Sequence, residues 1–287
     1  MMHVPWSLSL LFLASVGLAS YPTMNLPAIP EGMENALTDE QPHASYPESY
    51  EFTEEHPECV LGVRDQGRCG SCWAFAATGS LADRKCVITG KPTRLSPQDL
   101  LDCEKLNLGC KMGSLPDMAW TFLRKHGVAD DTCVPYESGR TSKSDKCSKK
   151  CELSYLAKNV TLATGVKHYK GEAAIMAAVA EGPVDVTFNV YTDFEVHWEK
   201  RTNETYVKTD KSILKFTGIH SVKVVGYGVD DKGIKYWTIE NSWGESGGFG
   251  GKNNRGGYIR VRRGTNECGI ERLVYAGWPV VQADLLG

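Results

Sequence analysis

The distribution of cysteines constrains this 287-residue chain more than any other feature. Nine of its ten cysteines lie between residues 59 and 151, while Cys268 stands alone near the C-terminus. In a chain that enters an oxidising compartment, such a set is typical of a disulfide framework. The spacing alone leaves the connectivity open, because many pairings are compatible with it.

The N-terminus indicates an oxidising compartment. Residues 6–18 are mostly apolar and end in small residues, which predicts a secretory signal peptide over residues 1–19. The proline-rich, acidic stretch that follows predicts a short pro-segment or N-terminal extension over residues 20–43. No later stretch has the 18 apolar residues of a membrane span. We therefore expect a protein of the secretory pathway, either in a lysosome-like vesicle or secreted.

The charge pattern excludes one class of partner. The formal net charge is −3 and no long run of one sign occurs, so nucleic-acid binding has no electrostatic footprint. Two triplets, Asn159-Val-Thr161 and Asn203-Glu-Thr205, are candidate glycosylation sites in a secreted chain.

Residues 66–75, Gln-Gly-Arg-Cys-Gly-Ser-Cys-Trp-Ala-Phe, combine a glycine-rich loop with the start of a helix. The loop ends at Cys72, and the residues after it favour a helix over 72–87. The positive end of a helix dipole stabilises a thiolate, which is the nucleophilic form of cysteine. Gln66 adds an amide donor near an anion formed beside that sulfur. The segment therefore predicts a reactive thiol.

The remaining pattern changes from helical to β along the chain. Ser96 and Pro97 have the residue types of an N-cap and a first helical position. Alternating apolar residues predict strands after residue 160, interrupted by one helix. A helical half followed by a β half predicts an α+β fold with two lobes and a cleft between them. Helices are expected over residues 117–126 and 172–180, and strands over 184–190, 222–229, 236–239 and 258–261.

A nucleophilic cysteine needs a base, and the base needs a group that orients it. His220 differs from the other histidines because it enters a predicted strand, 148 residues after Cys72. Asn241 follows 21 residues later and has the amide oxygen needed to hold an imidazole. Trp243 has a large apolar face that excludes water from such a contact.

With Gln66, Cys72, His220, Asn241 and Trp243 in this order, the chain resembles the papain-like cysteine proteases, and within them the cathepsin B-like branch. The resemblance implies a helical left lobe over residues 44–155 and a β-barrel-like right lobe over 156–287, within one peptidase domain over 44–287. It also implies peptide hydrolysis through a thioester acyl-enzyme, without metal or organic cofactor. Gln66 and the Cys72 amide form the implied oxyanion hole.

The resemblance extends to partners and cysteine pairing. It implies protein or peptide substrates, cystatin-like protein inhibitors and a monomer. If Cys72 stays reduced, nine cysteines remain, so at least one more is free, and Cys268 is the candidate. The other eight pair, by resemblance, as Cys59–Cys86, Cys69–Cys110, Cys103–Cys147 and Cys133–Cys151. A zinc site at Cys147 and Cys151 would need a second ligand pair.

Several segments depart from the family pattern. Residues 133–147, which match the occluding loop of cathepsin B, contain no histidine and no interior cysteine, which predicts an endopeptidase with little dipeptidyl carboxypeptidase activity. Leu273 falls at the S2 pocket floor, which predicts an apolar P2 preference. Gly113, Ser114 and Gly218 are the other expected substrate contacts, together with Trp243. The short pro-segment predicts weak latency, or latency supplied by another protein.

Two alternatives remain open from the sequence. Cys69-Gly-Ser-Cys72 at a helix start has the form of a thiol–disulfide oxidoreductase motif. A thioredoxin-like fold would need an apolar strand just before Cys69, and the residues there are polar. The second alternative is a non-catalytic binding protein with the papain fold. The intact Cys72, His220 and Asn241 set argues against it, because such relatives usually lose the nucleophile.

Overall fold

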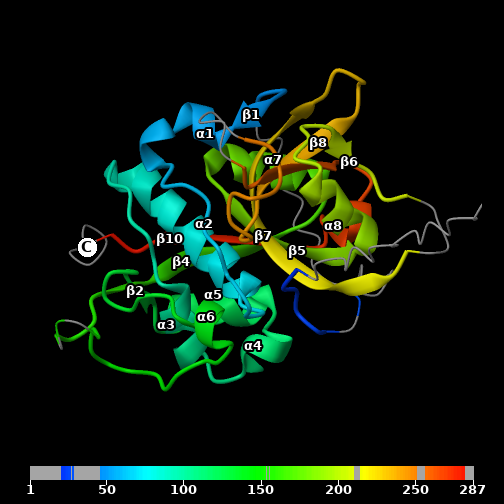
Figure 1. Ribbon diagram of the computed structural model, residues 1–287. Helices are drawn as coiled ribbons and strands as arrows, with labels where there is room; N and C mark the ends of the chain where they lie inside the picture. The colour runs from blue at the N-terminus through cyan, green and yellow to red at the C-terminus, as the bar shows by residue number, and fades with distance from the viewer. Residues whose placement is uncertain are drawn as a thin grey trace, which may run out of the picture.

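The computed structural model describes residues 21–26, 28, 46–152, 154, 156–209, 214–250 and 256–281. The predicted signal peptide and most of the predicted pro-segment lie outside these residues. Within them the protein has a helical lobe and a β lobe, with the long helix α2 (Cys72–Thr89) between the two (Figure 1). None of the described helices is both long and apolar enough to cross a membrane.

The helical lobe is built around α2 and two shorter helices. Apolar residues of α2, α3 and α5 bury a common core that includes Leu81, Leu100, Trp120 and Leu123. The elements of this half are α1 (Phe52–Glu55), α3 (Pro97–Cys103), α4 (Gly109–Met112), α5 (Pro116–Lys125), α6 (Ser138–Thr141), and the paired strands β2 (Val128–Ala129) and β3 (Val160–Thr161).

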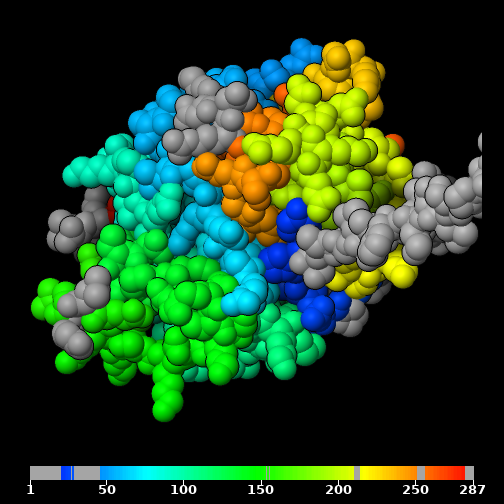
Figure 2. Space-filling model, viewed as in Figure 1, coloured from blue at the N-terminus to red at the C-terminus, as the bar shows by residue number. Residues whose placement is uncertain are grey.

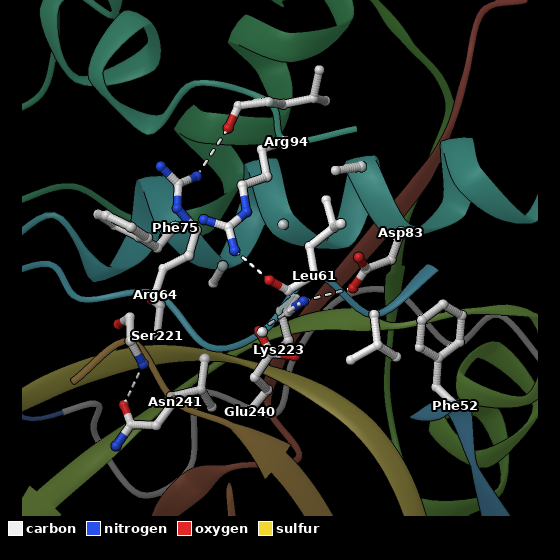
Figure 3. A pocket seen from close by; sticks show the side chains of 18 of the residues that line it. Phe52, Leu61, Arg64, Phe75, Asp83, Arg94, Ser221, Lys223, Glu240 and Asn241 are labelled. Carbon is white, nitrogen blue, oxygen red and sulfur yellow. Dashed lines mark hydrogen bonds and ion pairs between the residues drawn. The ribbon is translucent and has the colours of Figure 1, made fainter. Parts of the chain in front are cut away.

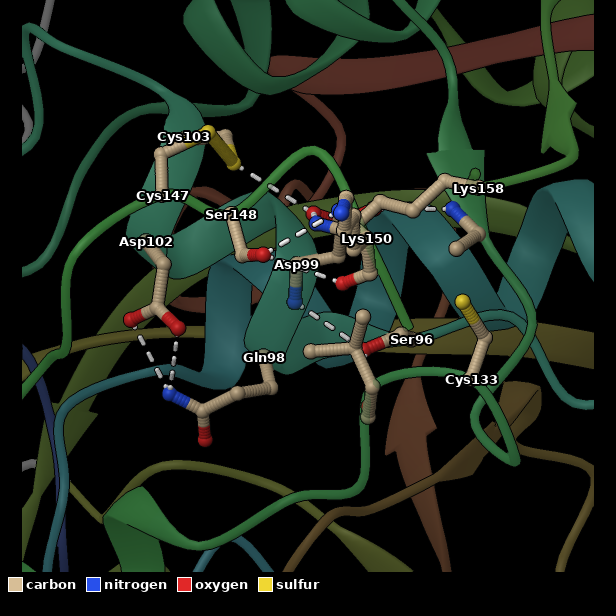
Figure 4. Close-up of polar contacts among 12 residues, drawn as sticks. Ser96, Gln98, Asp99, Asp102, Cys103, Cys133, Cys147, Ser148, Lys150 and Lys158 are labelled. Carbon is tan, nitrogen blue, oxygen red and sulfur yellow. Dashed lines mark hydrogen bonds and ion pairs between the residues drawn. A yellow bond between two sulfur atoms is a disulfide. The ribbon is translucent and has the colours of Figure 1, made fainter. Parts of the chain in front are cut away.

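Helix α3 begins where the sequence predicted, and Figure 4 shows the polar network around it. Ser96 Oγ accepts the Asp99 N–H at 3.0 Å and donates to the Val134 carbonyl at 2.6 Å. Asp99 binds the Lys158 ammonium at 2.5 Å and accepts the Ala129 N–H. Because both partners of this ion pair are almost fully buried, the network ties the loop after residue 150 to the helix.

The β lobe is one large sheet in the order β4-β10-β5-β7-β8-β9-β6, with β1 added beside β7. Neighbouring strands are antiparallel except for β6 and β9. Helices α7 and α8 belong to the same half of the chain. The bounds are β1 (Tyr50–Glu51), β4 (Ala163–Tyr169), α7 (Glu172–Glu181), β5 (Val184–Tyr191), α8 (Thr192–Glu199), β6 (Thr205–Tyr206), β7 (Phe216–Val229), β8 (Lys235–Glu240), β9 (Tyr258–Arg262) and β10 (Leu273–Pro279); two 3₁₀ turns, η1 (Pro57–Cys59) and η2 (Glu267–Gly269), complete the set.

The comparison with the predicted elements is close for the helices and less so for the strands. Residues 222–229 are only the second half of β7, which begins at Phe216, so His220 lies inside a strand rather than at its entry. Helix α8 and strand β10 were not predicted. Tyr50 and Glu51, placed by sequence in the helical half, pair with Tyr227 and Gly226 of the β lobe. The N-terminal part of the peptidase domain therefore crosses between the lobes.

Helix α2 packs against β7, β5 and β10, and so forms the seam between the lobes. Its fully buried Arg84 donates to the carbonyl groups of Ala178, Gly182 and Pro183 in the β lobe. Since a buried guanidinium is costly unless it is hydrogen-bonded, these contacts hold the end of α7 against α2.

The four disulfides are Cys59–Cys86, Cys69–Cys110, Cys103–Cys147 and Cys133–Cys151, the pairs that the resemblance implied. Cys72 and Cys268 are free thiols. All four bridges lie within residues 59–151, so the cross-links brace the loops around α2 and α3 rather than the sheet.

Candidate functional site

The predicted catalytic residues come from both sides of the seam. Cys72 is the first residue of α2, His220 lies in β7, and Asn241 follows β8 directly. Cys72 and His220 are fully buried. A hydrogen bond from the backbone of Ser221, the residue after His220, reaches the Cys72 sulfur. The packing of α2 on β7 therefore brings the thiol to the strand that carries the histidine.

His220 is held on two sides. Its Nε2 donates to Asn241 Oδ1 at 2.7 Å, and the Ser242 N–H donates to the same oxygen at 2.8 Å. The Trp243 ring stacks on the imidazole with a centroid distance of 4.6 Å. Within the described residues, His220 Nδ1 has no hydrogen-bond partner. This arrangement fixes the tautomer and leaves Nδ1 available for a second group.

Gln66 is also fixed in place. Its Oε1 accepts the Ser242 hydroxyl at 2.6 Å, and its Nε2 donates to the Cys69 carbonyl at 2.9 Å. The same Nε2 donates to the Pro22 carbonyl at 3.1 Å. The amide nitrogen therefore points at a peptide carbonyl oxygen that lies in the site, which is the geometry expected of an oxyanion donor.

Residues 21–26 lie across the site. Met24 and Ile219 exchange two backbone hydrogen bonds, at 2.8 and 3.1 Å, next to His220. Tyr21 stacks on Trp243 at 4.6 Å, and the Trp243 indole donates to the Pro22 carbonyl at 3.2 Å. In Figure 2 this dark-blue segment lies between surfaces of the two lobes. The site is therefore covered by the chain itself, which the shortness of the predicted pro-segment did not lead us to expect.

The expected substrate contacts meet this segment. A Cβ placed on Gly113 would lie 2.6 Å from Met24 Cγ, and one on Gly218 would lie 2.4 Å from Thr23 Oγ1. Both glycines are therefore required by the close approach of residues 23 and 24 of the same chain. Met24 is fully buried in the same apolar cluster as Leu273, whereas Ser114 is buried beside Gly113. The Met24 side chain is thus buried among apolar residues at the predicted substrate side.

Burial shapes the charge state of the catalytic pair. It raises the pKa of the Cys72 thiol to about 12 and lowers the pKa of the His220 imidazolium to about 4, although the bond to Asn241 raises the latter. Burial therefore favours the neutral form of each group while the site is covered. The covering segment contributes to this state, because it removes the site from water.

The sequence did not single out three groups that organise the site. Ser242 holds both Gln66 and Asn241. Tyr136 bonds the Ser71 hydroxyl at 2.6 Å and the Gln66 carbonyl at 2.8 Å, so it fixes the loop before Cys72. Pro22 belongs to the covering segment. Ser242 could have been noticed because it is next to Asn241 in the sequence. Tyr136 is a single tyrosine in a loop, so no sequence pattern indicated its role.

The alternative chemistries fit less well. Cys69 is bonded to Cys110 with an S–S distance of 2.05 Å, so Cys69 and Cys72 do not form a redox pair. No strand of the described chain leads into Cys69. In the part of the chain that the structure describes, no group of three His, Cys, Asp or Glu side chains is arranged to hold a metal ion.

Comparison with known proteins places this geometry in a family. A sequence model of the papain family of cysteine proteases matches residues 46–278. Cathepsin B-like CP2 of Giardia intestinalis is 40% identical over 81% of this chain and 74% of its own, and cathepsin B-like protease 1 of Arabidopsis thaliana is 38% identical over 74% and 56%. Procathepsin B S9 of Trypanosoma congolense has a TM-score of 0.73 at 30% identity, covering 90% of this chain and 84% of that one.

Replacing Met24 by Asp tests whether residues 21–26 control the reactivity of the thiol. A buried, unpaired carboxylate is costly, so the segment should dissociate and the site should hydrate. We expect Cys72 of the unprocessed chain to be alkylated by iodoacetamide at pH 7 at least about tenfold faster, since a lower pKa yields more thiolate. Peptide mapping separates Cys72 from Cys268, and Ile88→Asp, at an exposed residue of α2, is the matched control. Equal rates in Met24→Asp and the parent would contradict this role.

Proposed function

Because this chain belongs to the papain family of cysteine proteases and is cathepsin B-like, we propose that it is an endopeptidase that uses Cys72, His220 and Asn241. The hydrogen bond from Gln66 Nε2 to the Pro22 carbonyl is the observation that supports this assignment most strongly. A peptide carbonyl thus lies on the amide donor that the carbonyl of a scissile bond would have to meet.

In the proposed reaction, the Cys72 thiolate attacks the peptide carbonyl carbon and forms a tetrahedral intermediate. The Cys72 N–H and Gln66 Nε2 stabilise its oxyanion. The His220 imidazolium gives its proton to the leaving amine, and a thioester to Cys72 remains. His220 then takes a proton from water, which hydrolyses the thioester and restores the thiol. Asn241 holds the imidazole through both half-reactions.

We further propose that residues 21–26 keep the unprocessed chain latent. The segment runs from Trp243, on the primed side, to Gly113, on the side of the S1 and S3 subsites. A substrate of this family runs in the opposite direction, so the segment fills the cleft without presenting a productive bond. Cleavage near residue 43 would release it, and the buried Cys72 and His220 would then regain water and ionise as a pair.

The secretory pathway remains the proposed setting. The four disulfides require an oxidising compartment for their formation, and the papain-like fold implies peptide or protein substrates. Asn159 and Asn203 are both exposed, as glycan acceptors must be. A lysosome-like vesicle and secretion are both compatible with these features.

Covalent labelling tests the catalytic assignment. An epoxysuccinyl inhibitor should modify the processed enzyme once per chain at Cys72, because the thiolate attacks its epoxide, and peptide hydrolysis should stop in proportion. Cys72→Ala should abolish labelling and hydrolysis, while Cys268→Ala should leave both unchanged. Labelling of Cys69 would favour the oxidoreductase alternative, and the absence of any labelling would favour a binding protein.

The segment 133–147 generates a prediction about cleavage mode. It contains no histidine that could bind a substrate's C-terminal carboxylate. We therefore expect the processed enzyme to cleave a peptide internally, with kcat/KM changing less than about threefold when its C-terminus is amidated, because the lost charge has no partner. Mass spectrometry of the products distinguishes the modes. Rapid sequential release of C-terminal dipeptides from the free acid alone would contradict an endopeptidase.

The burial of Met24 in the apolar cluster that also includes Leu273 supports a preference for Leu, Val or Phe at P2. Glu271, the acidic residue nearest Leu273 in sequence, accepts bonds from the Trp237 indole and the backbone amides of Gly264 and Asn266, so it is already engaged.

Leu273→Glu tests that preference. For the parent enzyme we expect kcat/KM to be at least about tenfold higher with P2-Leu than with P2-Arg, because the pocket offers a guanidinium no charge partner. Leu273→Glu should raise the P2-Arg value, while Leu273→Gln, of the same shape without the charge, should not. Equal parent values for P2-Leu and P2-Arg would show that another carboxylate reaches the pocket.

A further inference from the structure

A buried charge cluster lies at the seam behind the catalytic residues (Figure 3). Lys223 Nζ lies 2.6 Å from Asp83 Oδ2 and 3.0 Å from Glu240 Oε1. The three side chains are only 11%, 15% and 13% exposed. An ion pair removed from water loses hydration that its attraction must replace, so a cluster of this kind is poor evidence for stability and calls for another role.

The three members come from the elements that carry the catalytic groups. Asp83 lies on α2, which begins at Cys72. Lys223 lies on β7, three residues after His220, and Glu240 ends β8 directly before Asn241. One ammonium group therefore joins the helix of the nucleophile to the strands of the base and its orienting amide.

Helix α2 is shaped to admit this lysine. Gly79 lies in its interior, where glycine costs about 1 kcal/mol relative to alanine. A Cβ at Gly79 would lie 2.9 Å from Lys223 Cδ and 3.3 Å from its Cε. Without a Cβ, Gly79 leaves room for the aliphatic part of the Lys223 side chain to pack against α2. The lysine can therefore extend to Asp83, although glycine at this position lowers the stability of the helix.

We propose that Lys223 is a positioning residue for proteolysis, holding α2 in register with β7 and β8 so that Cys72, His220 and Asn241 meet at reaction distance. This proposal rests on the catalytic roles given under the proposed function. Lys223 touches neither substrate nor reacting atoms, and it acts through the elements that it joins.

The cluster carries one cation and two carboxylates, so its charge is unbalanced. Burial raises the pKa of Asp83, Lys223 lowers it, and Glu240 raises it again, with a net shift upward. The other charged or titratable groups facing the cluster are Tyr258, whose hydroxyl lies 3.5 Å from Glu240 Oε2, and Arg64 and Arg94, which line the adjoining cavity of about 60 Å³. A cavity of this size admits water, so a proton can reach Asp83.

The raised pKa has a defined sign for stability. Between the usual range of an aspartate and the raised value, the folded protein binds a proton that the unfolded chain does not. The contribution of Asp83 to the free energy of unfolding is therefore present at acidic pH and is lost as the pH rises towards neutrality. A proton on Asp83 lowers the negative charge that the cluster holds out of water.

Steady-state kinetics of the processed enzyme test the positioning role. The informative variant is the charge-free triple Lys223→Met, Asp83→Asn, Glu240→Gln, because it leaves no unpaired buried charge and should fold. With active sites titrated by the epoxysuccinyl inhibitor, we expect kcat to fall about tenfold or more with KM within about twofold, since misplacement by a fraction of an ångström acts on the chemical step. Lys223→Arg, made alone in the parent enzyme, should keep most of the parental kcat, because it preserves the cation.

Two controls separate positioning from stability. Lys232→Met removes an exposed ion pair with Glu204 and should change neither constant. Asp83→Asn should reduce the difference in thermal midpoint between pH 7 and pH 5, at roughly 3 °C per kcal/mol for a chain of this size, while the Glu51 carboxyl, whose pKa burial also raises, keeps its own share. A charge-free triple with parental kcat, or an Asp83→Asn variant with the parental pH dependence, overturns the proposal. If the parent enzyme itself shows no Cys72-dependent turnover, the proposed function fails, and this proposal falls with it.

Discussion

The packing of helix α2 against strand β7 is the contact on which the rest of the structure depends. Cys72 comes from one lobe and His220 from the other, so the chemistry exists only where the two surfaces meet. Each catalytic group is ordered within its own lobe, through the Ser71–Tyr136 contact on one side and the Asn241 contact on the other. Side chains along the seam, among them Arg84 and Lys223, join the two lobes that carry them.

The contact between α2 and the sheet is held by buried charged side chains as well as by apolar packing. Arg84 and Lys223 both cross from one lobe to the other and end on oxygens there. Apolar contacts alone are non-directional and allow two surfaces to slide, whereas a buried cation fixes one arrangement, because every other leaves it unpaired. Directional contacts of this kind suit a site that needs a register accurate to a fraction of an ångström.

Residues 21–26, which cover the site, contact the same groups that a bound peptide substrate is proposed to contact. Met24 pairs with Ile219 in an isolated antiparallel bridge and is buried among apolar residues, while the Pro22 carbonyl accepts from the amide of Gln66. Under the proposed latency, the segment affects the ionisation of Cys72 and His220 as well as access, because both are fully buried while it is in place. A few well-placed residues can achieve this, since they occupy groups that the site already presents to a peptide.

The local features of the protein could be predicted from its sequence. The start of α2 at Cys72, the Ser96 cap and the strand residues that follow His220 depend on neighbouring residues, so short-range patterns indicate them. The catalytic set could be recognised because its residue types and order resemble a known family. Gly79 is visible in the sequence, but its packing against the Lys223 side chain could not be predicted from it.

The tertiary structure alone decided which distant residues meet. Met24 reaches Ile219 across 195 positions, and Lys223 reaches Asp83 across 140. No periodicity links such pairs, because each depends on how two lobes of separate topology are packed together. The sequence by itself therefore determined the elements and the chemical groups that they carry, while the packing of α2 on the sheet decided that these groups form one site and that the chain's own N-terminal residues cover it.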